Sequence, residues 1–324
     1  MVNAVMRNIQ RYHEKHDGWK NSLIQNNIEL AYPNWLIKKW QKQFGEHNTK
    51  KLCLFFIKKA PTYIRLDESR LTGKSMLSYI SKINLEVSQH SNFKNFFKVT
   101  RGKEKIFETE IFKNGAISIQ DPASGAVVNL IEPKNGDIIL DACAAPGTKS
   151  LYMAQKIGID GQIHASDKNI KRVDRAKLDL ERHNYENIQW SILDATKDNF
   201  PTYKKILIDV PCTGTGAIGR RPDIKWRLRV QDIKRMSELQ MHILDHMAKF
   251  LSPRGKLVYS TCSLEREENE DVVNAFLKKR PDFKLSVTHS LLPDQWVNSD
   301  GFMFAVPYKT KTDGLFAAVL QKQV

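Results

Sequence analysis

The stretch GDIILDACAAPGTKSLYMAQKIG, residues 136–158, decides the fold class of this 324-residue chain. It starts with an apolar run typical of a buried strand, passes through a loop of small residues, and ends in a segment with helical periodicity. The same alternation of strand and helix continues to the C-terminus. It predicts an α/β fold with a mostly parallel, doubly wound sheet.

Residues 113–324 carry this alternation. The expected strands are 136–143, 162–167, 188–194, 204–210, 256–262 and 313–322, and the expected helices are 149–158, 170–184, 230–251 and 267–280. In sheets of this kind the ligand binds beyond the carboxyl ends of the strands. We therefore expect the functional residues at that edge.

The first 112 residues have a different pattern. Helical periodicity at 3–12 and 33–44 is followed by alternating segments, with strands expected at 62–67, 93–101 and 116–121 and a helix at 69–83. Pro33 stands where a first-turn proline is favoured, and Gly45 stands where the helix is expected to end. We expect two domains, a basic helical and α+β region at 1–112 and the doubly wound domain at 113–324.

The charge of the chain is uneven. The net charge is +15, and residues 1–110 hold 20 Lys and Arg against 10 Asp and Glu, interleaved with the aromatic residues Trp35, Trp40, Tyr63, Phe93, Phe96 and Phe97. This composition favours a polyanionic partner, although a solvated basic surface accounts for the charge equally well. No apolar run is long enough for a membrane helix, and no signal peptide is evident, so we expect a cytoplasmic protein without a membrane partner.

Four cysteines are present, and no two of them have the CxxC spacing of a zinc site. We expect no metal and no disulfide framework. Cys53 lies in the apolar run LCLFFI and is expected to be a buried core residue. Cys143, Cys212 and Cys262 each fall at or just after the end of a predicted strand, which places all three at one edge of the sheet.

The segment DACAAPGTK, 141–149, follows the first strand of the sheet and opens a helix. It has neither a GxGxxG nor a GxxxxGK[ST] pattern, which disfavours dinucleotides and nucleoside triphosphates. Asp167, Asp194 and Asp209 end successive strands and favour an adenosine-containing cofactor, although each alone also suits a helix cap or turn. The candidate cofactor residues in the loop are Cys143, Ala144, Ala145, Pro146, Gly147, Thr148 and Lys149.

Two further segments place a cysteine in a loop. DVPCTGTG, 209–216, sets Cys212 directly after a proline, and YSTCSLEREEN, 259–269, sets Cys262 at a strand end before an acidic run with Glu268. A helix that starts after Cys262 would stabilise a thiolate, while the acidic residues would oppose it. Both interpretations stay open at this point.

Together, DACAAPGTK, DVPCTGTGAIGRRPDIKW and YSTCSLEREEN resemble the cofactor loop and the two cysteine motifs of the Nop/Sun family of RNA 5-methylcytosine methyltransferases. The resemblance runs from about residue 30 to the end and includes YPNWLIKKW, SIQDPAS and DGLFAAVLQK. VNAVMRNI, 2–9, is similar to the last helix of the NusB-like domain that precedes this core in bacterial members. The rest of that domain has no counterpart, so we expect a shortened relative or a truncated chain.

The resemblance implies a Rossmann-like class I methyltransferase sheet, a smaller basic α+β RNA-binding domain before it, and S-adenosylmethionine as cofactor. It further implies that Cys262 attacks carbon 6 of cytosine, that Cys212 assists release, and that Asp209 holds the base, with Lys149 as a further catalytic candidate. Thiolate addition is needed because carbon 5 alone is too weak a nucleophile to take a methyl group. DNA enzymes attack with the cysteine of the PC motif and lack the second motif, so the pair favours RNA.

The expected function is therefore methylation of cytosine carbon 5 in RNA, with 16S rRNA as substrate, by a monomer. A tRNA methyltransferase and a non-catalytic RNA-binding ribosome assembly factor remain alternatives, although the second would need neither thiol. GRRPDIKWR, 219–227, is a candidate RNA contact in which Arg220, Arg221 and Lys225 hold phosphates. Trp226 either stacks on a base or pins this loop to the core.

Overall fold

In the computed structural model, the described residues are Arg7, Arg11, 31–288 and 290–324. The chain forms two compact units, one of residues 1–60 with 218–228 and one of residues 61–217 with 229–324. The helix predicted at 3–12 and the segment 2–9 that resembles a NusB-like helix lie outside the described residues, apart from Arg7 and Arg11. The domain boundary expected at residue 112 stays a prediction.

The smaller unit is helical where it is described. It contains α3 (Asn34–Phe44), α4 (Glu46–Ile57) and the short α10 (Ile224–Arg227). Gly45 ends α3 with a φ of 78°, a conformation that favours glycine. The Tyr32 hydroxyl donates to the Cys53 carbonyl at 3.0 Å, and Cys53 is fully buried, as predicted.

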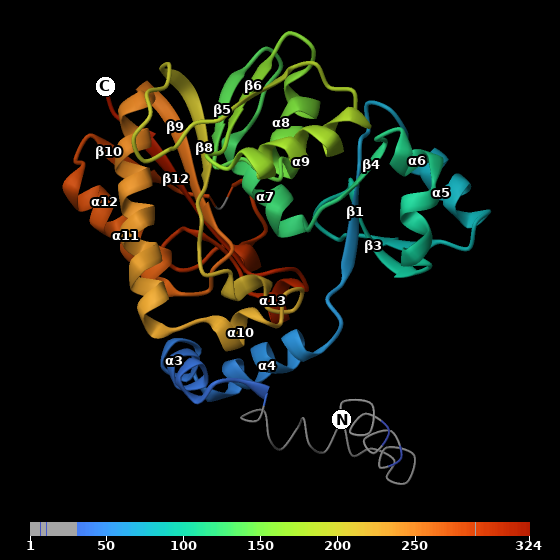
Figure 1. Ribbon diagram of the computed structural model, residues 1–324, viewed down its shortest axis with the longest axis horizontal. Helices are drawn as coiled ribbons and strands as arrows, with labels where there is room; N and C mark the ends of the chain where they lie inside the picture. Colours follow the sequence, from blue (N-terminus) through green and yellow to red (C-terminus); the bar gives the residue numbers. More distant parts are fainter. Residues whose placement is uncertain (1–6, 8–10, 12–30, 289) are drawn as a thin grey trace. The chain divides into compact units, whose positions relative to one another are not determined.

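The larger unit is built on the predicted α/β sheet (Figure 1). The path of its strands is β10-β12-β9-β8-β5-β6-β7, with β11 paired to β12. The strands from β9 to β7 along this path are parallel, and β12 is antiparallel to β9. Their bounds are β5 (Ile138–Ala142), β6 (Gln162–Ser166), β7 (Ile188–Ser191), β8 (Tyr203–Asp209), β9 (Leu251–Thr261), β10 (Phe283–Ser286), β11 (Met303–Ala305) and β12 (Leu315–Lys322).

Helices cover both faces of this sheet. Ile139 of β5 packs in one apolar cluster with residues of α7 and α8, while its neighbour Leu140 packs in a second cluster with residues of α11 and α12. Side chains alternate between faces along a strand, so the two clusters are the cores of the two faces. The helix bounds are α7 (Pro122–Ile131), α8 (Thr148–Ile157), α9 (Ile170–Glu181), α11 (Val230–Met247), α12 (Glu270–Lys279) and α13 (Pro307–Thr310).

The strands and helices predicted for this sheet are all present in the structure. Others were not expected from the sequence pattern, among them helices α7 and α13 and strands β10 and β11. Asp121 caps α7 by accepting a hydrogen bond from the Ala123 amide at 2.9 Å, so a capping residue and a following proline marked its start. Short 3₁₀ turns lie at 103–108, 215–217, 248–250, 266–268 and 294–296.

A second sheet belongs to the same unit. Its strand order is β2-β3-β1-β4, all antiparallel, with bounds β1 (Thr62–Leu66), β2 (Glu86–Gln89), β3 (Phe96–Arg101) and β4 (Ile117–Ile119). Helices α5 (Gly73–Ser81) and α6 (Glu110–Lys113) contribute to an apolar cluster with Ile64 and Phe97. Phe96 points the other way and packs against Tyr152 of α8, with ring centroids 6.0 Å apart.

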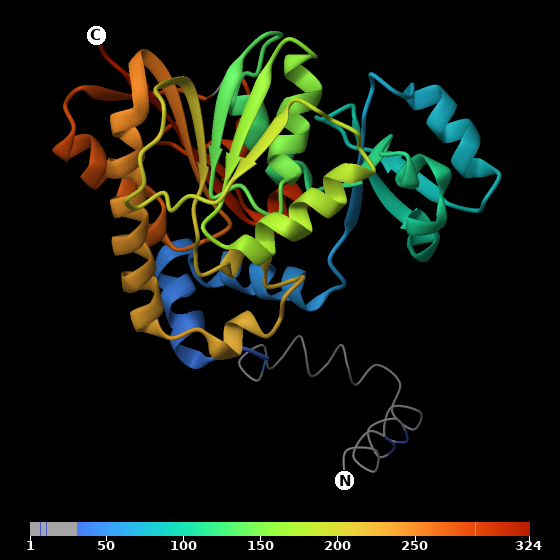
Figure 2. The same cartoon turned by 45° about the horizontal axis from the view of Figure 1, so that its top comes forward.

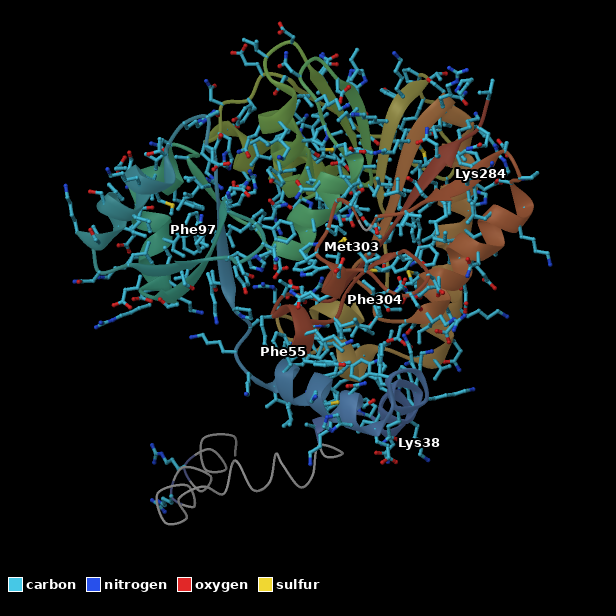
Figure 3. The ribbon with its side chains drawn as sticks, turned by 180° about the vertical axis from the view of Figure 1, so that it is seen from behind. Lys38, Phe55, Phe97, Lys284, Met303 and Phe304 are labelled. Carbon is cyan, nitrogen blue, oxygen red and sulfur yellow. The ribbon has the colours of Figure 1, made fainter. Side chains whose placement is uncertain are left out.

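The aromatic residues interleaved with the basic residues of the first 110 positions are mostly core residues, so they do not support the prediction of a polyanionic partner. Trp35 is half-buried, and five of the six are buried: Trp40, Tyr63, Phe93, Phe96 and Phe97. Their apolar area is too large to leave in water when a sheet and helices can cover it. The lysines of this region are mainly exposed, as the labelled Lys38 on α3 illustrates (Figure 3).

Across the described ranges, no helix combines the length and the apolar character needed to cross a bilayer.

Arg65 joins the smaller sheet to the larger one. It is fully buried on β1, donates from Nε to Gln120 Oε1 at 2.6 Å, and contacts the Gln155 side chain of α8. Its guanidinium lies 4.2 Å from the ring centroid of Tyr152. Burial lowers the pKa of Arg65 to about 10, which still leaves the side chain charged at neutral pH.

We predict that Arg65→Ala lowers the free energy of unfolding by about 2–4 kcal/mol, because it opens a cavity and leaves the buried Gln120 and the partly buried Gln155 without their donor. Urea denaturation followed by circular dichroism measures this loss. Lys98→Ala, at an exposed position of β3, is the control and should change stability by less than about 0.5 kcal/mol. Equal stability of the two variants would show that Arg65 does not hold the sheets together.

Candidate active site

Three cysteines meet the carboxyl edge of the parallel strands, as the sequence predicted. Cys143 directly follows β5, Cys262 directly follows β9, and Cys212 lies three residues after the end of β8. These strands are neighbours in the order β9-β8-β5 and run in the same direction (Figure 2). The Sγ atoms of Cys212 and Cys262 are 3.1 Å apart, within hydrogen-bonding distance.

The loop after β5 has an unusual backbone. Cys143 and Gly147 both have positive φ angles, 62° and 94°. A Cβ added to Gly147 would lie 3.0 Å from Trp190 Cζ2, so conformation and space both favour glycine there. The Ala144 amide donates to the Ser166 carbonyl at 2.8 Å and ties the loop to β6. Burial raises the pKa of the Cys143 thiol, which keeps that thiol protonated.

Asp141, at the end of β5, is a site residue that the sequence analysis missed. It is fully buried, and Ser150 of α8 donates to its Oδ2 at 2.5 Å. Its Oδ1 accepts no hydrogen bond from the residues that the structure describes. Burial raises the pKa of Asp141 to about 7. The available signal was a carboxylate within a strand that is otherwise apolar.

Lys149 and Asp209 form an ion pair beside the thiols. Lys149 Nζ is 2.6 Å from Asp209 Oδ2, and the Ser260 hydroxyl donates to Asp209 Oδ1 at 2.7 Å. Burial of Lys149 favours its neutral form, but the charge of Asp209 and the hydrogen bond to it outweigh that effect and raise the pKa of Lys149. Both oxygens of Asp209 are thus held, while its side chain remains about one third (32%) exposed.

Asp167 follows β6 and is buried, as a ribose-binding carboxylate would be. Its Oδ1 accepts from the Asn169 amide at 3.0 Å, and its Oδ2 lies 2.9 Å from Arg172 Nη1. Arg172 also contacts the Ala145 carbonyl, so one side chain of α9 connects Asp167 to the loop after β5. Asp167 and this loop are thereby brought together.

Asp194 lies three residues beyond the end of β7, in a turn. Its Oδ1 accepts from the Thr196 amide at 3.0 Å and from the Thr196 hydroxyl at 2.7 Å. Burial acts against ionisation, but these hydrogen bonds and nearby lysines lower the pKa of Asp194. Asp194 therefore uses its Oδ1 to stabilise this turn, as the alternative interpretation as a turn residue predicts.

The thiol pair is electrostatically asymmetric. The pKa of Cys212 is raised by its hydrogen bond to Cys262, by burial, and by the charges of Cys262, Glu268 and Asp209. The charge of Cys262 in turn contributes to the raised pKa of Lys149, which places a cation on the Cys262 side. A proton shared by the two sulfurs is therefore favoured on Cys212.

The basic loop at 219–227 belongs to the smaller unit. Arg220, Arg221 and Trp226 are exposed, and 59% of Trp226 is accessible. Ile224 is the buried residue of this loop, so of the two alternatives for Trp226, the one in which it pins the loop to the core is not supported. Lys225, which was predicted to hold a phosphate, instead contacts Tyr32: its Nζ lies 4.3 Å from the ring centroid.

The part of the chain that the structure describes contains no group of three His, Cys, Asp or Glu residues suited to holding a metal ion.

Two family models match the chain. The model described as 16S rRNA methyltransferase RsmB/F matches residues 128–321, and that of an RsmF/B-like ferredoxin-like domain matches residues 32–102. The first covers the sheet and every cysteine at its carboxyl edge. The second covers α3, α4 and strands β1 to β3.

The chain is also similar to individual proteins of known name and to solved structures. The Bacillus subtilis protein named probable ribosomal RNA small subunit methyltransferase B is 31% identical over 331 residues, which cover 99% of this chain and 73% of that protein. Ribosomal RNA small subunit methyltransferase B of Vibrio vulnificus is 31% identical, with 100% and 74% covered. The solved structure of a methyltransferase homolog protein from Pyrococcus horikoshii superposes with a TM-score of 0.80 at 28% identity, covering 93% of this chain and 99% of that one.

The raised pKa of Asp141 predicts a pH dependence of stability. Between the ordinary aspartate pKa of about 4 and the folded value of about 7, the unfolded chain loses this proton while the folded protein keeps it. The wild type should therefore lose stability relative to Asp141→Asn as the pH rises, by at most about 1.4 kcal/mol per pH unit. Urea denaturation at pH 5, 6, 7 and 8 measures the difference.

Asp160→Asn, at an exposed aspartate between α8 and β6, is the matched control and should show no such trend. A constant difference between the wild type and Asp141→Asn over this range would mean that Asp141 titrates as an ordinary carboxyl group.

Proposed function

Because the chain belongs to the RsmB/F family of 16S rRNA methyltransferases, we propose that it methylates carbon 5 of a cytosine in small-subunit rRNA, with S-adenosylmethionine as the methyl donor. The observation that carries this proposal is the pair of thiols, Cys212 and Cys262, whose sulfurs lie 3.1 Å apart at the carboxyl edge of the sheet. RNA binding alone would require no thiol, and two thiols match the two covalent steps of this reaction.

The residues around the loop after β5 suit the cofactor. Loop residues 143–149 would contact it along the backbone, and the buried, unpartnered Oδ1 of Asp141 suits a cationic donor such as an ammonium group. Asp167 suits the hydroxyls of a ribose, and Asp194 stays a candidate for the adenine side. When bound, S-adenosylmethionine supplies an electrophilic methyl group on a sulfonium and leaves as a neutral thioether.

The first step is the addition of Cys262 to the base. The thiolate forms an S–C6 bond, and the electrons of the C5–C6 double bond move onto the ring, which makes carbon 5 nucleophilic enough to take the methyl group. Asp209 is available to hydrogen-bond the cytosine edge because Lys149 and Ser260 orient it while part of it remains exposed. This ion pair thus positions the base over the sulfur.

The second step is the release of the product. Once Cys262 is a neutral thioether, Cys212 loses the anionic neighbour and the hydrogen bond that raise its pKa. Cys212 gives its proton to solvent and takes the proton from carbon 5. The electrons return to the C5–C6 bond, the S–C6 bond breaks, and Cys262 leaves as a thiolate. One proton reaches solvent for each methyl group transferred.

RNA binding is proposed for the basic residues of the first 110 positions and for Arg220 and Arg221. Phosphate contacts need exposed cations, and most lysines of α3, α4 and β3 are exposed. The exposed Trp226 beside these arginines is suited to stack on an unpaired base. A tRNA substrate would use the same catalytic residues, and the names of the relatives favour rRNA.

The roles of the two cysteines predict opposite phenotypes. Cys262→Ala should abolish methylation and form no covalent RNA complex, because the first bond cannot form. Cys212→Ala should still attack and take up the methyl group but stall before release, so an RNA-linked band should accumulate on a denaturing gel.

Cys53→Ala, at a buried cysteine of the smaller unit, controls for the loss of a thiol as such and should keep both activity and turnover. An adduct that accumulates in the Cys262 variant would assign the nucleophile to Cys212. Full activity in both variants would rule out a covalent mechanism.

A further inference from the structure

Glu268 is a buried carboxylate that contacts both cysteine loops. It is the last residue of the 3₁₀ turn Arg266–Glu268, and its side chain is fully buried. The Thr213 amide donates to its Oε2 at 2.9 Å, and the Ser263 hydroxyl donates to its Oε1 at 2.6 Å. Thr213 follows Cys212 in the chain and Ser263 follows Cys262, so one carboxylate holds the residue next to each thiol.

Further hydrogen bonds complete this arrangement. The Thr213 hydroxyl also donates to Oε1, and Gln240 of α11 donates to Oε2 at 2.8 Å. Gln240 additionally donates to the Pro211 carbonyl at 2.9 Å, directly before Cys212. Four donors thus surround a single carboxylate. Such a set compensates a buried negative charge, whose burial would otherwise be costly.

We propose that Glu268 is a positioning residue that aligns the two cysteine loops and keeps the shared proton on Cys212, which leaves Cys262 as the nucleophile. The part that concerns the nucleophile rests on the proposed function. The part that concerns the proton rests on the hydrogen bonds of Glu268 to the two cysteine loops and on the charges that face the thiols, and it holds whether or not the protein methylates RNA.

The charges that face the two thiols are distributed to support this assignment. Glu268 and Asp209 are the anions that act on Cys212, while the ammonium of Lys149 acts with Cys262. Tyr259 of β9 is buried near Cys212, and burial together with the charge of Glu268 raises its pKa, so it stays neutral. Negative charge on the Cys212 side and positive charge on the Cys262 side both favour a thiolate at Cys262.

Glu268→Gln separates the charge from the positioning. The amide oxygen can accept from the Thr213 amide and from Gln240, as Oε2 does in the wild type. The amide nitrogen can donate to the hydroxyls of Thr213 and Ser263, which rotate to accept. This variant therefore keeps the same four hydrogen-bond partners, with the two hydroxyls now accepting, and removes the charge. Glu268→Asp keeps the charge on a shorter side chain.

The experiment measures alkylation of each cysteine by iodoacetamide from pH 6 to pH 10, with peptide mass spectrometry under single-hit conditions and without RNA. In the wild type, Cys262 should react at lower pH than Cys212. In Glu268→Gln, the midpoint for Cys212 should fall by about one pH unit, the scale on which a nearby charge shifts a pKa. Glu268→Asp should keep the wild-type order.

Asp271→Asn is the matched control, because it removes an exposed negative charge from the first turn of α12 and should leave both midpoints unchanged. Unchanged midpoints in a folded Glu268→Gln variant would overturn the proposal. If that variant does not fold, the wild type alone still decides, since a Cys212 that reacts at lower pH than Cys262 contradicts the assigned proton.

A methylation assay on the same preparations separates this inference from the proposed function. Wild-type activity combined with unchanged midpoints in Glu268→Gln refutes the role of Glu268 and leaves the methyltransferase proposal intact. A shifted midpoint in a protein whose wild type methylates no RNA supports the role of Glu268 and refutes the proposed reaction.

Discussion

The contact between the sulfurs of Cys212 and Cys262 is the constraint on which the rest of the site depends. It is possible because β8 and β9 are parallel neighbours in which Asp209 lies opposite Ser260. The segments that follow β8 and β9 therefore leave the sheet side by side. Cys212 lies three residues after Asp209, and Cys262 lies two residues after Ser260. The Gly216 amide donates to the Cys262 carbonyl at 2.9 Å, and a Cβ at Gly216 would lie 2.1 Å from the Gly314 carbonyl oxygen. Small residues are thus required for the loops to approach this closely.

The second theme of the site is the control of charge in a buried environment. Burial raises the pKa of Asp141 to about 7 and keeps the Cys143 thiol protonated, while the charge of Asp209 and the hydrogen bond to it raise the pKa of Lys149. The same low-dielectric surroundings make small differences in neighbouring charge decisive for the thiols. Cys212 and Cys262 can therefore take different roles although their side chains are chemically identical. The edge of the sheet determines their positions, and the surrounding charges determine which thiol is protonated.

The sequence was sufficient for the features that depend on local pattern. Alternating apolar segments predicted the parallel sheet, and strand ends predicted that Cys143, Cys212 and Cys262 share one edge. The sequence was insufficient where burial decides. Phe96 and Phe97 were counted with the basic residues as a sign of a polyanionic partner, because a local pattern does not say which face of a strand another element covers. Asp141 was missed and Glu268 was noted only as part of an acidic run for the same reason, since donors to these carboxylates come from α8, α11 and the loop of Cys212.

The central claim is that the thiol pair activates carbon 5 of a cytosine, and release of the hydrogen at that carbon tests it most directly. Small-subunit rRNA labelled with tritium at carbon 5 of its cytosines, incubated with the protein and carbon-14-labelled methyl donor, allows both events to be counted. The account predicts one tritium released to water for each methyl group transferred. Methyl transfer without tritium release would contradict it, because a methyl group placed on a nitrogen or on a ribose oxygen leaves the carbon 5 hydrogen in place.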